Sequence, residues 1–273
     1  MKKKAIGFLG GQLGDQIICL GAVKVLAEDY PDTDFTMAMS EKFSAIAPLF
    51  ENQPYIKDIH IWQGYDAAWP TENDKKFIID NKYDLVFNPM DNNQHPRWFQ
   101  TMHQVSSTCQ RYGLRLPDTN EVFLKKNFKL LPMYKNHIAL SVFANNGEGV
   151  KSLSVGRAQE LVDNLKSMGH KVLQLHGPKD PVLKNLEVIS KSFVKAAQVL
   201  HSCKLLVTGD TAMSWVASAY KIPTLGLYAY SYHPNATTSV NWQPINPNAK
   251  YLEANIVANI PNDLIIEEVG KIL

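Results

Sequence analysis

The chain has 273 residues, of which 45% are hydrophobic and 20% charged, an ordinary composition for a globular protein with one large or two medium domains. Lys and Arg (28) nearly balance Asp and Glu (26), so charge gives no support for a nucleic-acid partner. No apolar run approaches the roughly 18 residues of a membrane span. We therefore expect a cytoplasmic protein with at most peripheral membrane contact.

The cysteines and histidines give no sign of a structural or catalytic metal. Cys19, Cys109 and Cys203 lie far apart without a CxxC pair, which argues against a disulfide framework or a zinc site. The eight histidines form no HxxxH or HxH pair. The sequence therefore predicts neither a metal site nor a cofactor.

In the first half of the chain, short β-rich runs alternate with helical patterns. Such alternation is typical of a parallel sheet that helices cover on both faces. The expected strands are 5–9, 35–39, 56–62 and 83–87, and the expected helices are 16–28, 43–50 and 73–81. Residues 114–136 contain two prolines and little periodicity, so the domain boundary is placed there, between 1–130 and 131–273.

The alternation starts again in the second half. The expected strands are 137–143, 171–175, 186–189, 204–208 and 224–228, and the expected helices are 154–168, 193–202, 212–220 and 262–273. Two successive Rossmann-like lobes predict an α/β fold in which two parallel sheets face a central cleft. That cleft is the natural ligand site of such a fold.

A glycine-rich loop at 10–15 joins the first expected strand to the first helix. Gly10, Gly11 and Gly14 allow a tight turn, and the helix amides behind them could bind phosphate or sugar oxygens. The glycine spacing differs from the i, i+2, i+5 nicotinamide fingerprint, so a dehydrogenase is not supported. Asp15 fits two interpretations about equally well: an acid that caps the helix, or a base that removes a proton from a hydroxyl.

Two loops of the second lobe occupy the equivalent position after a strand. Thr211 and the amides after it could hold a diphosphate, whereas Asp210 is favoured as a helix N-cap because a carboxylate repels phosphate. Lys151 could neutralise charge on a departing nucleoside diphosphate, the chief electrostatic demand of glycosyl transfer without a metal. Its alternative is an ordinary solvated lysine. Glu148 could act in the same loop or simply face solvent.

Two further segments give weaker signals. Residues 91–99 mix amide, imidazole, guanidinium and aromatic groups suited to a polar acceptor such as a sugar. The candidate acceptor-binding residues are Gln12, His95 and Arg97. The tyrosine-rich segment 228–238 could stack on a base or bind a ribose, although an ordinary aromatic loop explains it nearly as well.

The order of these loops resembles the heptosyltransferase-like family of bacterial glycosyltransferases, family nine, which has a GT-B fold. In the first lobe, Leu13-Gly14-Asp15 matches an LGD sequence of the family, and Tyr30-Pro31 matches a YP pair that follows a helix. The segment Asn52-Gln53-Pro54-Tyr55 differs from an NPY-like triplet by one inserted residue.

The resemblance continues in the second lobe. Lys151 matches a lysine-containing loop of the family, and Asp210-Thr211-Ala212 stands where the family has DTG. Trp215 falls at the position of a family histidine. These two departures, Ala212 and Trp215, concern the contact with the donor phosphate.

The resemblance implies a transferase that moves a heptose or hexose from a nucleotide-diphosphate sugar by metal-independent inverting displacement. The implied acceptor is a glycan, a lipopolysaccharide-core or other lipid-linked saccharide, or a protein. It further implies that Asp15 is the base and that Lys151 and Thr211 hold the donor diphosphate. The candidate donor-binding residues are Gly14, Ser152, Gly209, Asp210, Thr211, Ala212 and Met213. Two alternatives stay open: a non-catalytic nucleotide-sugar-binding protein, and a sugar-nucleotide epimerase or hydrolase of the same fold.

Overall fold

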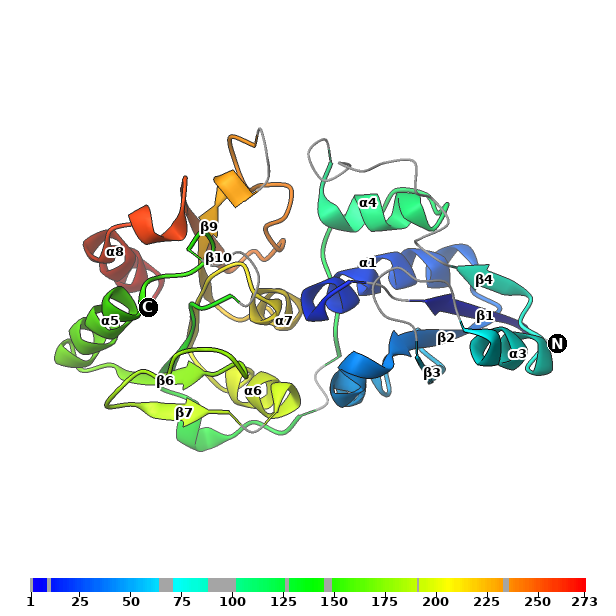
Figure 1. Cartoon of the computed structure of the whole chain (residues 1–273), viewed down its shortest axis with the longest axis horizontal. Coiled ribbons are helices and arrows are strands. Elements are labelled where there is room, and N and C mark those ends of the chain that lie inside the picture. Colours follow the sequence, from blue (N-terminus) through cyan, green and yellow to red (C-terminus); the bar gives the residue numbers. More distant parts are fainter. Residues whose placement is uncertain are drawn as a thin grey trace. The chain divides into compact units, whose positions relative to one another are not determined.

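The computed structural model describes residues 2–8, 11–63, 71–87, 102–125, 128–144, 149–190, 192–232 and 236–273. The chain forms two compact units, residues 1–127 and 128–273 (Figure 1). Each unit has its own sheet, and every strand pairing recorded in the two sheets is parallel. Within the described residues, no helix has the length and apolar character needed to cross a membrane.

The sheet of the first unit has the strand order β3-β2-β1-β4. Its strands are β1 (Lys3–Phe8), β2 (Thr33–Ser40), β3 (Asp58–Trp62) and β4 (Leu85–Phe87). The helices are α1 (Leu13–Asp29), the 3-10 helix η1 (Glu41–Ile46), α2 (Ala47–Phe50), α3 (Glu72–Asp80) and α4 (Gln104–Arg111). Alternate residues of β1, Ile6 and Phe8, pack with Trp62 against Phe77 of α3. Burial of this apolar set holds α3 on the sheet.

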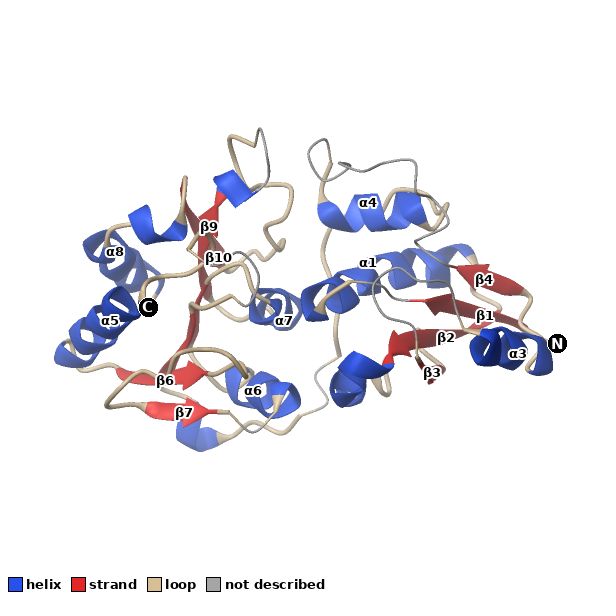
Figure 2. Ribbon diagram, viewed as in Figure 1, coloured by secondary structure: helices blue, strands red, loops and turns tan. Residues whose placement is uncertain are grey.

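The sheet of the second unit has the order β10-β9-β8-β5-β6-β7. Its strands are β5 (His137–Ser141), β6 (Lys171–Leu175), β7 (Glu187–Ile189), β8 (Leu205–Thr208), β9 (Thr224–Ala229) and β10 (Ala249–Ala254). Its helices are η3 (Pro132–Tyr134), α5 (Val155–Ser167), α6 (Phe193–Leu200), α7 (Ala212–Tyr220), η4 (Tyr230–Tyr232), η5 (Val257–Asn259) and α8 (Asn262–Ile272). Figure 2 shows α5 and α8 on one face of this sheet and α6 and α7 on the other.

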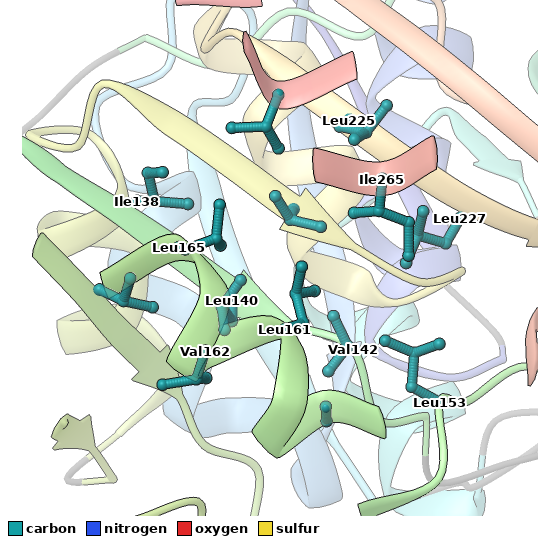
Figure 3. Packing of buried hydrophobic residues seen from close by; sticks show 14 of the residues in the cluster. Ile138, Leu140, Val142, Leu153, Leu161, Val162, Leu165, Leu225, Leu227 and Ile265 are labelled. Atoms are coloured by element: carbon teal, nitrogen blue, oxygen red, sulfur yellow. The ribbon is translucent and has the colours of Figure 1, made fainter. Parts of the chain in front are cut away.

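The period-2 alternation of β5 divides its side chains between these two faces. Ile138 and Leu140 pack with Leu161 of α5 and Ile265 of α8 in one buried apolar cluster (Figure 3). Ser141 has the opposite parity and lies on the side of α7. The core therefore fixes which polar side chains at the end of β5 face the helix that follows β8.

The expected α/β fold with parallel sheets is confirmed, but one α-helix, one strand and the short 3-10 helices η3, η4 and η5 were not expected from the sequence. Helix α4 has the sequence QVSSTCQR, which is poor in strong helix formers, and its Cys109 packs on Ala22 and Val25 of α1. Strand β10 has the sequence AKYLEA, which favours a helix, yet it pairs in parallel with β9. In α4 and β10, tertiary packing overrides local propensity.

Candidate active site

The strand order of the second sheet changes direction between β5 and β8. From β5 the chain proceeds outward through β6 to β7, and from β8 it proceeds the other way through β9 to β10. Ser141 and Thr208 are register partners at the carboxyl ends of β5 and β8. Open α/β sheets bind ligands outside the carboxyl ends of their strands at such a switch point. The loops that begin after Ser141 and Thr208 therefore flank the natural ligand position of this unit.

Several hydrogen bonds hold the described part of the loop after β5. The Leu153 amide donates to the Val142 carbonyl at 3.2 Å, and the Ala144 amide donates to Ser152 Oγ at 2.9 Å. The Val257 amide donates to the Val150 carbonyl at 2.8 Å. The backbone on both sides of Lys151 is thus fixed, and the Ser152 hydroxyl already accepts one bond from its own loop.

Lys151 forms an ion pair with Asp210, the residue two positions after β8. Lys151 Nζ lies 2.5 Å from Asp210 Oδ2, and the two side chains are only 12% and 16% exposed. The same ammonium lies 3.5 Å from the centroid of the Tyr232 ring. Lys151 is therefore not an ordinary solvated lysine, its alternative interpretation. The favoured interpretation of Asp210 as a helix N-cap was wrong, because the N-cap of α7 is Thr211. Three loops, after β5, β8 and β9, contribute to one charged group.

Gly209 is required where the loop after β8 passes the loop after β5. Its amide donates to the Ser141 carbonyl at 3.0 Å. A Cβ atom on Gly209 would lie 2.9 Å from the Lys151 carbonyl oxygen, closer than real Cβ atoms approach. The missing side chain of Gly209 therefore allows the Lys151 and Asp210 segments to lie together.

Thr211 is the N-cap of α7, but its hydroxyl does not cap the helix. Thr211 Oγ1 instead lies 3.0 Å from Thr208 Oγ1 and 3.3 Å from Ser141 Oγ. The amides of Ala212 and Met213 open α7 and have no i−4 partner inside the helix. Because the helix dipole also makes this end positive, an anion is favoured there.

A hydrogen-bonded chain of hydroxyl groups supports this first turn. Tyr228 donates to Ser214 Oγ at 3.1 Å, and Ser214 Oγ donates to the Thr211 carbonyl at 2.7 Å. Burial raises the pKa of Tyr228 well above its ordinary value, and the charge of Asp210 acts in the same direction. The Tyr228 ring is fully buried, so this member of the tyrosine segment does not stack on a base.

The two departures from the family pattern lie on α7 itself. Ala212 is its first residue, and Trp215 is only 2% exposed. Met213 is also buried. Helix α7 is buried from Met213 to Tyr220, so Trp215 lies within the packed part of the second unit.

In the first unit, the described part of the glycine-rich loop builds the start of α1. Gly11 has a φ of 81°, which favours glycine, and a Cβ there would lie 2.5 Å from Asp15 Oδ2. The Gln12 amide donates to that same oxygen at 2.7 Å. Asp15 is thus a first-turn acid that holds the helix N-terminus, one of its two interpretations. This contact occupies Oδ2 and does not test the role of Asp15 as a base.

The charge of Asp15 also acts on Arg111 at the end of α4. Burial lowers the pKa of Arg111, and the charges of Cys19 and Asp15 oppose that shift. Burial raises the pKa of Cys19 to about 12, and Asp15 adds to this effect. Arg111 could not be recognised from the sequence because α4 itself was not expected.

A further polar turn at the carboxyl end of β6 was also missed. The Gly177 amide donates to Asp180 Oδ2 at 2.7 Å, and His176 Nε2 lies 2.9 Å from the Asp180 carbonyl oxygen. Burial raises the pKa of Asp180. Since β6 pairs with β5, this turn lies on the same sheet edge as the loop of Lys151. Its signal was the His-Gly-Pro-Lys-Asp sequence directly after a strand.

Several predicted residues lie outside the described residues: Gly10, Glu148, the whole segment 91–99 with His95 and Arg97, and residues 233–235 of the tyrosine-rich segment. Among the residues that the structure does describe, no group of three or more His, Cys, Asp or Glu side chains could hold a metal ion. In the second unit the structure thus brings together Lys151, Ser152, Gly209, Asp210 and Thr211. Gly14, Gln12 and Asp15 share the start of α1 in the first unit.

Residues 159–262 match glycosyltransferase family 9 (heptosyltransferase). The matched segment contains Asp210, Thr211 and Tyr232, and Lys151 lies before it. The expected likeness to the heptosyltransferase-like family is confirmed, and this family match indicates a glycosyltransferase. No relative was found among curated protein sequences.

Solved structures show the same fold over nearly the whole chain. A family 9 glycosyl transferase from Veillonella parvula is 16% identical with a TM-score of 0.74, covering 99% of this chain and 97% of its own. The ADP-heptose lps heptosyltransferase II of E. coli is 14% identical with a TM-score of 0.77, covering 98% of each chain. An E. coli heptosyltransferase with ADP is 15% identical with a TM-score of 0.69, covering 99% of this chain and 100% of its own. The expected GT-B fold is confirmed.

Proposed function

We propose that this protein transfers a sugar from a nucleotide-diphosphate sugar to a glycan, lipid-linked saccharide or protein acceptor in the cytoplasm. One observation carries the proposal: the Lys151 ammonium lies with Asp210 directly before the N-terminus of α7. A diphosphate is the ligand chemistry that an ammonium and a row of helix amides both favour. The family match in the same unit supports this assignment.

The donor half of the reaction would use the second unit. Lys151, Thr211 and the first amides of α7 hold the diphosphate, and the neighbouring loop residues Gly209 and Ser152 shape its position. When the bond between the anomeric carbon and the diphosphate breaks, negative charge grows on the leaving oxygen. A fixed ammonium and fixed amides stabilise that charge without a metal ion. Binding requires Lys151 to exchange part of its contact with Asp210 for a phosphate oxygen.

The acceptor half would use the first unit. An acceptor hydroxyl oxygen attacks the anomeric carbon from the side opposite the diphosphate, which inverts the configuration. Asp15 takes the proton of that hydroxyl, and general base catalysis of this kind contributes about 10²- to 10⁴-fold. Gln12, His95 and Arg97 are the proposed acceptor contacts. This step requires Asp15 to reach the acceptor hydroxyl when both substrates are bound.

An ADP-sugar is the first donor to test. Two of the structurally similar proteins are described as an ADP-heptose heptosyltransferase and a heptosyltransferase with ADP. We expect calorimetric titration to show binding of an ADP-sugar in preference to GDP-, UDP- and CMP-sugars. Equal or tighter binding of another base would reassign the donor without changing the residues that hold its diphosphate.

The mechanism is tested by Asp15→Asn. The amide oxygen of asparagine can still accept the Gln12 N–H, so α1 should keep its N-terminal contact, while the base is lost. We expect sugar transfer to fall about 100-fold or more and donor binding to stay within twofold of the wild-type value. Unchanged turnover in this variant would refute the mechanism.

Asp74→Asn is the matched control. Asp74 is also the third residue of a helix in the first unit, α3, and it accepts the Thr71 amide at 3.0 Å. Asparagine at position 74 can also accept the Thr71 N–H, but it removes the carboxylate that lies 3.0 Å from His60 Nε2, so this variant should be no more stable than wild type and should leave transfer unchanged. Equal loss of transfer in both variants would mean that Asp15 acts only through helix capping.

A non-catalytic nucleotide-sugar-binding protein is the second candidate. The replacement of a family histidine by the buried Trp215 favours it, because an indole cannot carry the positive charge that a histidine can present to a phosphate. Donor binding without transfer or hydrolysis for every tested donor and acceptor would support this candidate. A sugar-nucleotide epimerase or hydrolase would instead convert the donor in the absence of an acceptor.

A further inference from the structure

The Lys151 ammonium has an aromatic contact that the sequence motifs do not account for. Its Nζ lies 3.5 Å from the centroid of the Tyr232 ring and 2.5 Å from Asp210 Oδ2. The face of a tyrosine ring is electron-rich and attracts a cation within about 6 Å of its centroid. Lys151 is therefore held by one charged group and one neutral group that come from different loops.

The chain at Tyr232 is tied to the segment that follows β10. Tyr232 ends η4, the turn that directly follows β9. Both the amide and the hydroxyl of the preceding Ser231 donate to the carbonyl of Asn255, just after β10. The backbone that carries Tyr232 is therefore held by contacts in which Asp210 takes no part.

We propose that Tyr232 is a positioning residue that keeps the Lys151 ammonium at the donor-phosphate site, an inference that rests on the function proposed above. Asp210 and a diphosphate compete for the same cation because both are anions. The ring has no net charge, so it attracts the ammonium without an ionic repulsion of phosphate. It also restricts a long side chain that would otherwise lose rotamer freedom when the donor binds.

Inorganic pyrophosphate is the probe, because it presents the diphosphate without the base or the sugar. Loss of a cation–π contact that is exposed or partly desolvated changes affinity by about three- to tenfold. We expect Tyr232→Leu to weaken pyrophosphate binding by about that factor in calorimetry. Tyr232→Phe keeps the ring and should bind within twofold of the wild-type protein.

A series of progressively fluorinated phenylalanines at position 232 separates electrostatics from packing. Fluorination preserves ring shape and withdraws electron density from the ring face, so affinity for pyrophosphate should fall stepwise along the series. The series also covers the case in which Tyr232→Leu does not fold, because each member keeps a ring of similar volume. Circular dichroism checks the fold of every variant.

Two failures of this experiment have different meanings. In the first case, wild-type protein binds pyrophosphate, Lys151→Met weakens that binding, and affinity does not change along the fluorinated series. Tyr232 then does not position Lys151, and this inference is overturned. If wild-type protein binds neither pyrophosphate nor any nucleotide sugar, the proposed donor site is wrong and the inference fails with it.

Discussion

Gly209→Ala tests whether the close approach of two loop backbones positions the proposed donor site. The added Cβ would lie 2.9 Å from the Lys151 carbonyl oxygen, about half an ångström inside the 3.4 Å at which ordinary contact begins. The Leu227 and Val142 carbonyl oxygens lie at 3.9 and 4.0 Å and leave little room to move away. All three neighbours are backbone atoms, so the overlap cannot be relieved by a side-chain rotation.

The overlap corresponds to an overpacked site, which typically costs about 1–3 kcal/mol. Gly209 does not have a positive φ, so the cost comes from contact rather than from backbone conformation. If the Lys151 segment moves to relieve the overlap, the ammonium leaves its place beside Asp210. We then expect pyrophosphate affinity to fall about tenfold or more, since about 1.4 kcal/mol is one factor of ten.

Unfolding of the second unit can be followed through Cys203, which is buried and is the one cysteine of residues 128–273. Thiol labelling across a urea series, read by mass spectrometry, gives the free energy of unfolding of this unit. Gly156→Ala is the control, because a Cβ on this α5 glycine would meet nothing within 4 Å. Alanine is the better helix former by about 0.5–1 kcal/mol, so this variant should be more stable than wild type.

The two glycine variants should therefore move stability in opposite directions, and only Gly209→Ala should weaken pyrophosphate binding. A Gly209→Ala variant with wild-type stability and wild-type affinity would refute the close approach of the two loops. Lower stability with unchanged affinity would show that the loops cross there without positioning Lys151.

Two further predictions concern titration and thiol access. Burial lowers the pKa of His170 from 6.5, and Lys204, whose Nζ lies 3.2 Å from His170 Nδ1, acts in the same direction. Below that pH the folded state therefore binds fewer protons than the unfolded state. The free energy of unfolding, measured by urea denaturation, should fall as the pH is lowered through about 6.5. His170→Gln should reduce this dependence on pH. An unchanged dependence would contradict the lowered pKa of His170. Burial raises the pKa of Cys19 and of Cys109 to about 12, so neither thiol should react with iodoacetamide at neutral pH until the first unit unfolds. Fast labelling of either residue in the native protein would contradict their burial.

Much of the fold could be predicted from local sequence pattern. The apolar runs that became β5, β6 and β8 are buried strands, and Ser154 and Ser192 cap helices at the predicted positions. Segments whose structure depends on distant partners were not predicted. Helix α4 depends on α1, and β10 depends on β9.

The candidate site, like the fold, was predicted in its local features but not in its long-range contacts. Parallel strands place all their carboxyl ends at one edge, so residues that follow successive strands, such as Lys151 and Thr211, could be expected at the same edge of a sheet. The partners of these residues could not be expected. Nothing in the local sequence pairs Lys151 with Asp210, or brings the Tyr232 ring onto the same ammonium.

The sequence by itself determined the α/β class, the strand-to-helix loops and the residue types available for phosphate chemistry, because periodicity and glycine content act over a few neighbouring residues. Only the tertiary structure decided that β5 and β8 lie side by side at the switch point. Strand order depends on contacts between residues far apart in the chain, where local preferences carry no information. That order turns a lysine, an aspartate and a tyrosine from three separate loops into one candidate phosphate site.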